Sequence, residues 1–364
     1  MVTDESTQPQ ILTKLLELLT KLLKLLKKLW QQLVALYHPD NLKQQGTKPS
    51  VILITLTILL PVILIGWWWS IEPSLFDVQA IAQQQATRHN ESMVTGYVTT
   101  YTLITIASTL LDKSGGYLSN DIIPPSIFMD DMPNWEFGVL QQVREFTKVL
   151  RNDISRSKTQ SIEDPDLAKA EPKFNADNQS WFWPTSETEY QEGIEFLNRY
   201  LHRLADPQNN TAQFLARTDN LRDWLEEVVK RLGGLSQQLS ASVGQLRINT
   251  DLAGEINQNS NTEVLIKTPW RQIDDVFYQA RGNCWALIHL LRAIAIDFND
   301  VLAKRNATVM LQQIIRELEM TQKTVWSPMI LNGSGLGLFA NHSLVLSSYI
   351  SRANIGIIEL YNLL

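Results

Sequence analysis

Ser155 and Lys158 stand three residues apart in the sequence SRSK, a spacing that can support nucleophilic catalysis. On a helix this spacing puts the Lys one turn from the Ser, where it can accept the proton of the hydroxyl. Enzymes that form acyl intermediates with penicillin pair such an SxxK element with a later KTG element. Here the similar sequence KSG, at 113–115, comes before SRSK, and no SDN lies between them. The favoured interpretation is that Ser155 ends the preceding helix, with Ser155 and Lys158 kept as catalytic candidates.

Acidic side chains supply a second set of catalytic candidates. Asp121 and Asp130 lie in a long loop at 112–134, and Glu163 lies in another at 155–185. A pair of carboxylates can hydrolyse a glycosidic bond, one as acid and the other as base or nucleophile. No spacing fixes the separation of these residues, and the loops lack the EF-hand pattern for calcium. Solvated loop residues and helix N-caps are therefore the favoured interpretation.

The histidines and the cysteine do not indicate a metal or cofactor site. The five His are scattered without an HExxH pattern, and the single Cys284 excludes an internal disulfide and a cysteine-based zinc site. The glycine-rich sequence at 332–338, NGSGLGL, lacks the GK[ST] ending of a phosphate-binding loop and is interpreted as a turn. We therefore expect no metal and no cofactor.

Large apolar side chains in the two long loops call for an explanation. Trp135 and the sequence WFWP at 181–184 can stack on a sugar or a partner protein, but packing is the commoner role of aromatic rings and is favoured here. The first loop also contains Ile122, Ile123, Ile127, Phe128 and Met129. These residues are too apolar for a free loop. We predict that the loop packs across the helical body as a structural strap.

Helical periodicity dominates the chain after residue 70. It predicts helices over 74–93, 95–111, 135–154, 186–205, 212–232, 235–243, 270–304, 308–325 and 343–364. Gly233-Gly234 is interpreted as a break between two of them. No set of alternating strands is present. The expected fold class is all-α, with a single N-terminal transmembrane helix followed by a large, mainly helical domain with long ordered loops.

Residues 51–69, VILITLTILLPVILIGWWW, contain no charged residue. At about 1.5 Å per residue they reach about 28 Å, close to the ~30 Å hydrocarbon core of a bilayer. Their final three Trp suit a membrane interface, and Pro61 is tolerated in such a helix. No signal-peptide cleavage site follows. We predict a single-pass signal anchor in the inner membrane, with residues 1–50 in the cytoplasm and 70–364 in the periplasm.

The region 1–50 contains an amphipathic pattern at 11–37. Lys and other polar residues recur there every three or four positions among leucines. One interpretation is a helix in the membrane interface, with its Lys beside lipid headgroups. The other is a Leu-rich coiled coil that forms a homo-oligomer. The wide apolar face and Trp30 favour membrane lipid as the partner of this helix, as it is for 51–69.

The charge distribution argues against nucleic acid as a partner. Residues 1–50 carry seven Lys and four Asp or Glu, a net charge of +3. Because the whole chain has a net charge of −6, residues 70–364 carry a net charge of −9. Phosphate binding requires a basic patch, which this acidic domain does not offer. An envelope protein is the expected partner.

Several long stretches after the apolar segment resemble the DUF2333 family, which consists of gram-negative envelope proteins without an assigned function. They include LLDKSGGYLSNDIIPP at 110–125, MPNWEFGVLQQVREF at 132–146, RTDNLRDWL at 217–225 and the long end from 326 to 360. The resemblance implies no catalytic or binding residue. We therefore expect a non-enzymatic scaffold or accessory subunit that acts through protein contacts. The alternative is a periplasmic hydrolase or transferase that acts on peptidoglycan or another glycan.

Overall fold

The computed structural model describes residues 47–156, 163–206, 208, 211–248, 263–327, 329–334 and 337–364, together with residues 20, 21, 24, 27, 28 and 31. The chain forms two compact units, Met1–Ile65 and Gly66–Leu364. Most of the predicted helix at 11–37 lies outside the described residues. The six residues that are described there are helical and exposed.

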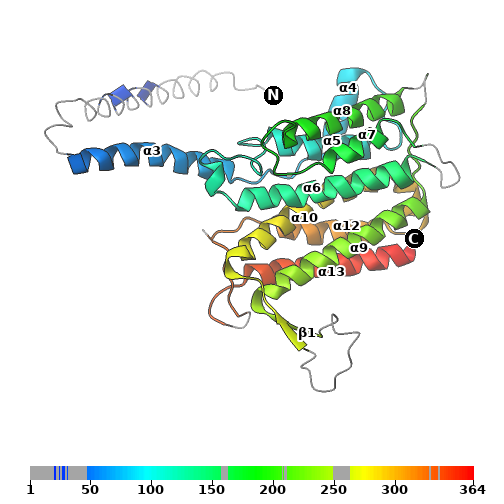
Figure 1. Ribbon diagram of the computed structural model, residues 1–364. Helices are drawn as coiled ribbons and strands as arrows, with labels where there is room; N and C mark the ends of the chain where they lie inside the picture. The colour runs from blue at the N-terminus through cyan, green and yellow to red at the C-terminus, as the bar shows by residue number, and fades with distance from the viewer. Residues whose placement is uncertain are drawn as a thin grey trace, which may run out of the picture. The chain divides into compact units, whose positions relative to one another are not determined.

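The helix α3 (Thr47–Trp69, Figure 1) begins in the first unit and ends in the second. Large apolar side chains are exposed along it, from Val51 and Ile52 to Leu64 and Ile65. In the described part of the chain, no helix qualifies as long and apolar enough to cross a membrane. The side chains of Leu53 and of residues 47–50, which belong to α3, are outside that part. The signal anchor at 51–69 stays a prediction.

The second unit is built almost entirely of helices, which confirms the all-α class. They are α4 (Val78–His89), α5 (Tyr97–Asp112), α6 (Asp131–Val149), α7 (Leu167–Phe174), α8 (Ser186–Ala205), α9 (Thr218–Ser240), α10 (Ile273–Asp297), α11 (Asn299–Lys304), α12 (Thr308–Glu319) and α13 (His342–Leu363). In Figure 1, α6 and α10 run through the middle, with α5, α7 and α8 on one side and α9, α12 and α13 on the other.

The central helices α6 and α10 pack with their backbones in contact. A Cβ atom on Gly138 would lie 2.0 Å from the carbonyl oxygen of Gln279, and one on Gly282 would lie 2.0 Å from that of Trp135. Only glycine fits these positions, because each added methyl group would collide with backbone that cannot move aside. Val139, Val143 and Phe146, at helical spacing on α6, are fully buried.

Two predicted element boundaries are wrong. Gly233-Gly234 lies inside α9, which continues to Ser240. Leu232, Leu235 and Leu239 keep the apolar period across the glycines and are buried, so packing against α13 offsets a helix-propensity penalty of about 1 kcal/mol for each glycine. The second long loop contains α7, which is short and carries Pro172.

A β-hairpin, which the sequence did not predict, extends from the helices. It consists of β1 (Gln245–Ile248) and β2 (Glu263–Ile266), paired antiparallel with Gln245 opposite Ile266. The hairpin follows α9 and precedes α10 in the chain.

Candidate functional site

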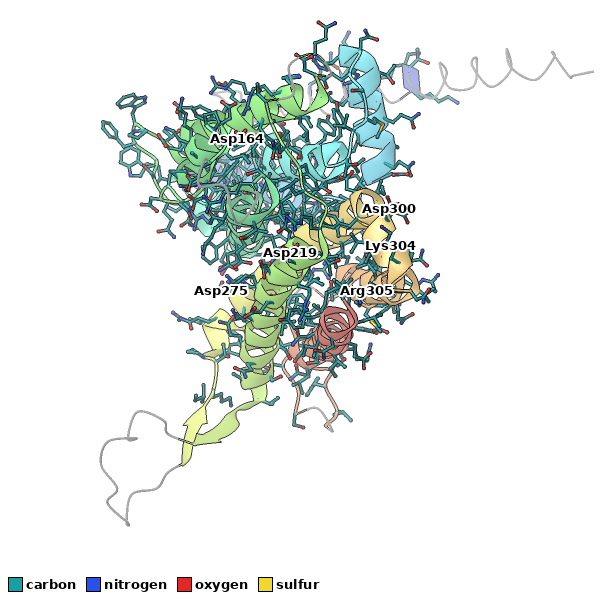
Figure 2. The ribbon with its side chains drawn as sticks, turned by 90° about the vertical axis from the view of Figure 1, so that its right-hand side faces the viewer. Asp164, Asp219, Asp275, Asp300, Lys304 and Arg305 are labelled. Carbon is teal, nitrogen blue, oxygen red and sulfur yellow. The ribbon has the colours of Figure 1, made fainter. Side chains whose placement is uncertain are left out.

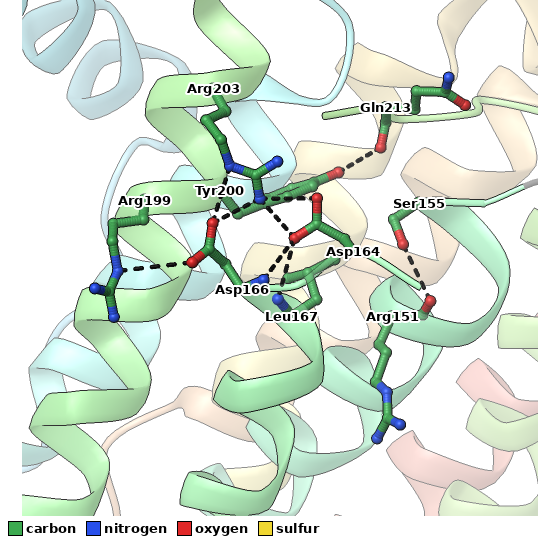
Figure 3. Close-up of polar contacts among 9 residues, drawn as sticks. All are labelled: Arg151, Ser155, Asp164, Asp166, Leu167, Arg199, Tyr200, Arg203 and Gln213. Atoms are coloured by element: carbon green, nitrogen blue, oxygen red, sulfur yellow. Dashed lines mark hydrogen bonds and ion pairs between the residues drawn. The ribbon is translucent and has the colours of Figure 1, made fainter. Parts of the chain in front are cut away.

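Ser155 ends the helix that continues α6, as the helix-exit interpretation expects. The π-helical turn Leu150–Ile154 follows α6 directly. The Ser155 hydroxyl is buried and donates a hydrogen bond of 3.0 Å to the carbonyl oxygen of Arg151 (Figure 3). Lys158 lies outside the described residues. The hydroxyl proton is thus used in a contact with the preceding turn, which is a common role of Ser at a helix end.

Glu163 belongs to an ion-pair cluster. Its carboxylate lies 2.7 Å from Arg151 Nη2 and 3.6 Å from Arg156 Nη1. Arg151 Nη1 also contacts Glu171 at 2.7 Å. The cluster ties residue 163 to the end of α6 and to α7. Each carboxylate is therefore held in an ion pair with a guanidinium.

A second ion-pair cluster lies beside the first and is shown in Figure 3. Arg203 Nη2 lies 2.6 Å from both Asp164 Oδ1 and Asp166 Oδ2. Asp164 Oδ1 also accepts the amide of Asp166 at 2.9 Å and that of Leu167 at 3.2 Å. Asp164 therefore joins the start of α7 to Arg203 of α8, which fixes this part of the second loop against α8.

The other two candidates, Asp121 and Asp130, are loop and cap residues. Asp130 Oδ1 accepts the amide of Asp131 at the start of α6, and Asp121 accepts the hydroxyl of Ser126 at 3.0 Å. Both side chains are exposed. In the described part of the chain, no hydrogen bond or ion pair connects them to Ser155 or Glu163, and no group of three or more His, Cys, Asp or Glu is arranged to hold a metal ion.

The first part of the loop between α5 and α6 is held by a buried ion pair that sequence reasoning missed. Lys113 Nζ lies 2.6 Å from Glu136 Oε1, with both side chains almost completely buried. Glu136 also accepts the amides of Leu118 at 2.8 Å and Ser119 at 2.9 Å. Burial raises the pKa of Glu136, and the contact with Lys113 opposes only part of that rise. The KSG sequence therefore has a structural role.

The second part of the same loop contradicts the predicted strap. Ile122, Ile123, Ile127 and Phe128 are exposed, Phe128 by 78%. Met129 alone among the five predicted strap residues packs against the core. The loop is indeed held to the helical body, but by its polar residues, because buried backbone amides need acceptors and Glu136 supplies them.

The predicted packing role of the aromatic residues is right for Trp135 and wrong for the other three. Trp135 is fully buried beside Trp285, with ring centroids 5.2 Å apart. Trp181, Phe182 and Trp183 are exposed. They belong to residues 180–184, which we call the aromatic turn.

Hydrogen bonds fix the shape of the aromatic turn. The Ser180 hydroxyl donates to the carbonyl oxygens of Phe182 and Pro184, each at 3.0 Å. The side-chain amide of Asn120 donates to the Ser180 carbonyl oxygen at 2.8 Å, which connects the turn to the loop between α5 and α6. The turn thus displays its rings from a backbone that is held in place.

The segment that follows α3, residues 70–77, is bound tightly to α10. Glu72 forms a bidentate ion pair with Arg281, with 2.8 Å from its Oε1 to Arg281 Nε. The amide of Phe76 donates to His289 Nε2 at 3.0 Å, while His289 Nδ1 contacts the Trp285 carbonyl oxygen at 2.7 Å. Burial lowers the pKa of His289 to about 3, so its ring stays neutral and can accept this bond.

A cleft of about 730 Å³ opens beside this segment. Trp67, Ile71, Tyr278, Arg281 and Lys323 contribute to its lining. Arg281 is already satisfied there, because its Nη1 also donates to the carbonyl oxygens of Thr321 and Lys323 at 2.8 Å. The lining offers aromatic surface and a satisfied ion pair, which suits packing or recognition better than proton transfer.

A different kind of surface lies where α13 ends. Arg217, Asp219, Lys304 and Arg305 line a cleft of about 640 Å³ beside Leu364. Figure 2 looks onto this charged surface, where Asp219, Lys304 and Arg305 are labelled.

Residues 42–364 match the model of a family described as an uncharacterised protein conserved in bacteria, DUF2333. This match covers nearly the whole chain. No curated protein and no solved structure matches.

Proposed function

This chain belongs to the DUF2333 family, and we propose that it is a non-enzymatic scaffold or accessory subunit of the bacterial envelope that acts through protein contacts. Residues 51–69 anchor it in the inner membrane, with residues 1–50 in the cytoplasm and 70–364 in the periplasm. The observation that carries the contact role is the aromatic turn, in which Trp181, Phe182 and Trp183 are all exposed.

Side-chain exposure supports the membrane anchor. Apolar side chains are exposed on successive residues of α3, for example Leu59 and Leu60 or Ile63 and Leu64. A helix that is apolar on all sides is stable when protein or lipid surrounds it and not when water does. The excess of Lys in 1–50 supports the orientation, because cytoplasmic flanks of membrane segments are enriched in basic residues.

The topology is tested with reporter fusions in a gram-negative host. Alkaline phosphatase, which is active only after export, is fused after Leu364 in one protein and before Met1 in the other. We expect activity from the C-terminal fusion alone, in the membrane fraction. Activity from the N-terminal fusion alone would reverse the orientation, and recovery of the C-terminal fusion in a membrane-free fraction would contradict the anchor.

The aromatic turn has the properties of a protein-binding hot spot. Trp and other aromatic residues contribute most of the binding energy in many interfaces. A backbone that is already held by hydrogen bonds, as Ser180 holds this turn, loses little conformational entropy when a partner binds. Surface rings of this size, adjacent along the chain, are also unusual without a binding role.

The contacts of the catalytic candidates support a non-enzymatic role. Ser155 donates to the turn before it, and Glu163 is held by Arg151 and Arg156. Asp130 serves as the N-cap of α6. Each of these side chains thus has a local structural partner, whereas a general base must be available to the substrate.

Site-specific crosslinking tests the contact surface. A photoreactive phenylalanine analogue replaces Phe182 in the full-length chain in cells, and a matched chain carries it at Val309, an apolar residue of α12 that is 76% exposed. We expect a crosslinked product of defined mass from position 182 and none from position 309. The product should disappear when Trp181 and Trp183 are both replaced by Ser.

Three outcomes of this experiment would contradict the proposal. Equal products from both positions would mean non-specific contact. A product that contains only a second copy of this chain would identify a homo-oligomer in place of an accessory subunit. No product from position 182 in intact cells would leave the aromatic turn without a protein partner.

A further inference from the structure

Exposed apolar side chains lie close to the last residues of α3, which belong to the second unit. Within that unit, a Cβ atom on Gly66 would lie 3.3 Å from Pro125 Cβ and 4.0 Å from Met129 Sδ. Ile123 and Phe128 flank this contact along the chain, with exposures of 71% and 78%. We call the following set the apolar rim: Trp67, Trp68, Ile122, Ile123, Ile127 and Phe128.

The loop that carries the rim is held in position. The amide of Phe128 donates to the Pro125 carbonyl oxygen at 2.9 Å, and that of Met129 donates to the Ser126 carbonyl oxygen at 2.8 Å. Pro125 and Ser126 are buried. These contacts fix the backbone between the exposed residues, so the rim side chains cannot fold back into the core without disrupting the loop.

The end of α3 is attached equally firmly to the same loop. A Cβ atom on Gly115 would lie 2.8 Å from the ring of Trp69, so the ring packs directly on the loop backbone. Gly115 has φ +87°, which excludes most other residues there. The loop between α5 and α6 thus contacts α3 at Gly66 and Trp69. The exposed apolar side chains of the loop lie beside these contacts.

We propose that the apolar rim is a second membrane-contact site, whose side chains insert into the interfacial layer of the bilayer that holds α3. This inference rests on the proposed anchor and adds to it. Gly66 lies in the last turn of the apolar helix, so whatever lies within a few ångströms of Gly66 is close to the membrane surface when 51–69 spans the bilayer. Trp, Phe and Ile are the side chains that bind this layer.

The charges near the rim identify the type of lipid surface. Asp121 and Asp130, on either side of the apolar residues, are exposed carboxylates. They would be repelled by anionic headgroups, so the attraction must come from burial of apolar surface. Zwitterionic phospholipid is therefore sufficient for the contact. A rim inserted in this way would hold the second unit directly against the bilayer.

The test uses the full-length chain reconstituted into phosphatidylcholine vesicles. Single cysteines at Ile123 or Phe128 carry an environment-sensitive fluorophore, and Val309→Cys is the control because it is equally exposed. Val309 is also distant from the end of α3. Glu319, at the other end of α12, lines the cleft beside residues 70–75, and Val309 lies about 15 Å along the helix axis from Glu319. Cys284 is buried with its pKa raised to about 12, so it stays unlabelled.

We expect a blue-shifted emission, strong quenching by lipid-borne spin labels and loss of iodide quenching at positions 123 and 128. Position 309 should show the opposite. Iodide quenching that is the same at all three positions, in chains that float with the vesicles, would overturn the rim proposal and leave the anchor intact. Chains that do not float would overturn the anchor, and the rim with it. Protection that requires added cell extract would overturn the lipid contact and assign the rim to a protein partner.

Discussion

The loop between α5 and α6 has two parts that differ in a way their sequences do not suggest. Residues 113–120 are mostly polar, yet Tyr117, Leu118 and Asn120 are buried and Lys113 pairs with Glu136 inside the protein. Residues 121–128 contain the large apolar side chains, yet these are exposed. In this loop the buried part is the one whose backbone amides have an acceptor in Glu136, because a buried backbone needs partners for its amides.

The largest effect is expected from the polar part. Lys113→Met should lower the free energy of unfolding by about 3–5 kcal/mol, because it leaves the Glu136 carboxylate buried without its counter-charge. Urea unfolding of the full-length chain measures this change. Lys230→Met, in the exposed pair with Glu226, is the matched control and should leave stability almost unchanged, because solvent screens an exposed ion pair. Similar losses in the two variants would remove the contrast between buried and exposed pairs.

Sequence periodicity located most helices because the apolar stripe of each is a local property. The predicted range 186–205 coincides with α8, and the predicted range 135–154 overlaps most of α6. The predicted break at Gly233-Gly234 was wrong because packing against α13 stabilises a continuous α9. That contact is between distant residues, so no local sequence pattern indicates it. The short α7 was missed because Asp164, which accepts the amide of Leu167 at the start of the helix, acts together with the distant Arg203.

The candidate site was less predictable than the helices. The helix-exit role of Ser155 followed from its position, but Lys113 and Glu136 are brought together by the fold. The exposure of the aromatic turn and of the apolar rim contradicts the ordinary preference of large apolar residues for the interior. Such departures are expected where a surface meets another molecule, and a single sequence contains no signal for that surface.

Asp131, where the exposed part of the loop meets α6, should make stability depend on pH. Burial and the nearby carboxylates of Asp130, Asp274 and Asp275 raise the pKa of Asp131 to about 7. A raised pKa means that folding disfavours the ionised carboxylate, so its contribution is fully present below the unfolded value near 3.8 and is lost as the pH rises through about 7.

Asp131→Asn should therefore stabilise the protein by roughly 1 kcal/mol at pH 8, a figure reduced for the partial exposure of Asp131, and by little at pH 5. Thermal unfolding at the two pH values measures the difference. Asp300→Asn, at an exposed position of α11, is the control. Equal stabilisation by Asp131→Asn at both pH values would show that the carboxylate does not titrate in this range.

Ser155→Ala should have a smaller effect. The substitution removes one buried hydrogen bond, to the carbonyl oxygen of Arg151, and should lower stability by about 0.5–1 kcal/mol. The wild-type chain should not be labelled covalently by a fluorescent penicillin, because the hydroxyl is committed to this bond. Labelling that Ser155→Ala abolishes would instead revive the acyl-transfer alternative.

The smallest effect is expected from the apolar part of the loop. Ile123→Ser and Phe128→Ser together should change the free energy of unfolding in detergent by no more than about 0.5 kcal/mol, because exposed side chains lose little by substitution. Leu118→Ser, in the buried part of the same loop, should destabilise by about 2–4 kcal/mol. A double variant as unstable as Leu118→Ser would mean that the rim packs against the protein. An unchanged stability, combined with weaker protection from iodide in vesicles, would mean that these side chains serve the membrane and not the fold.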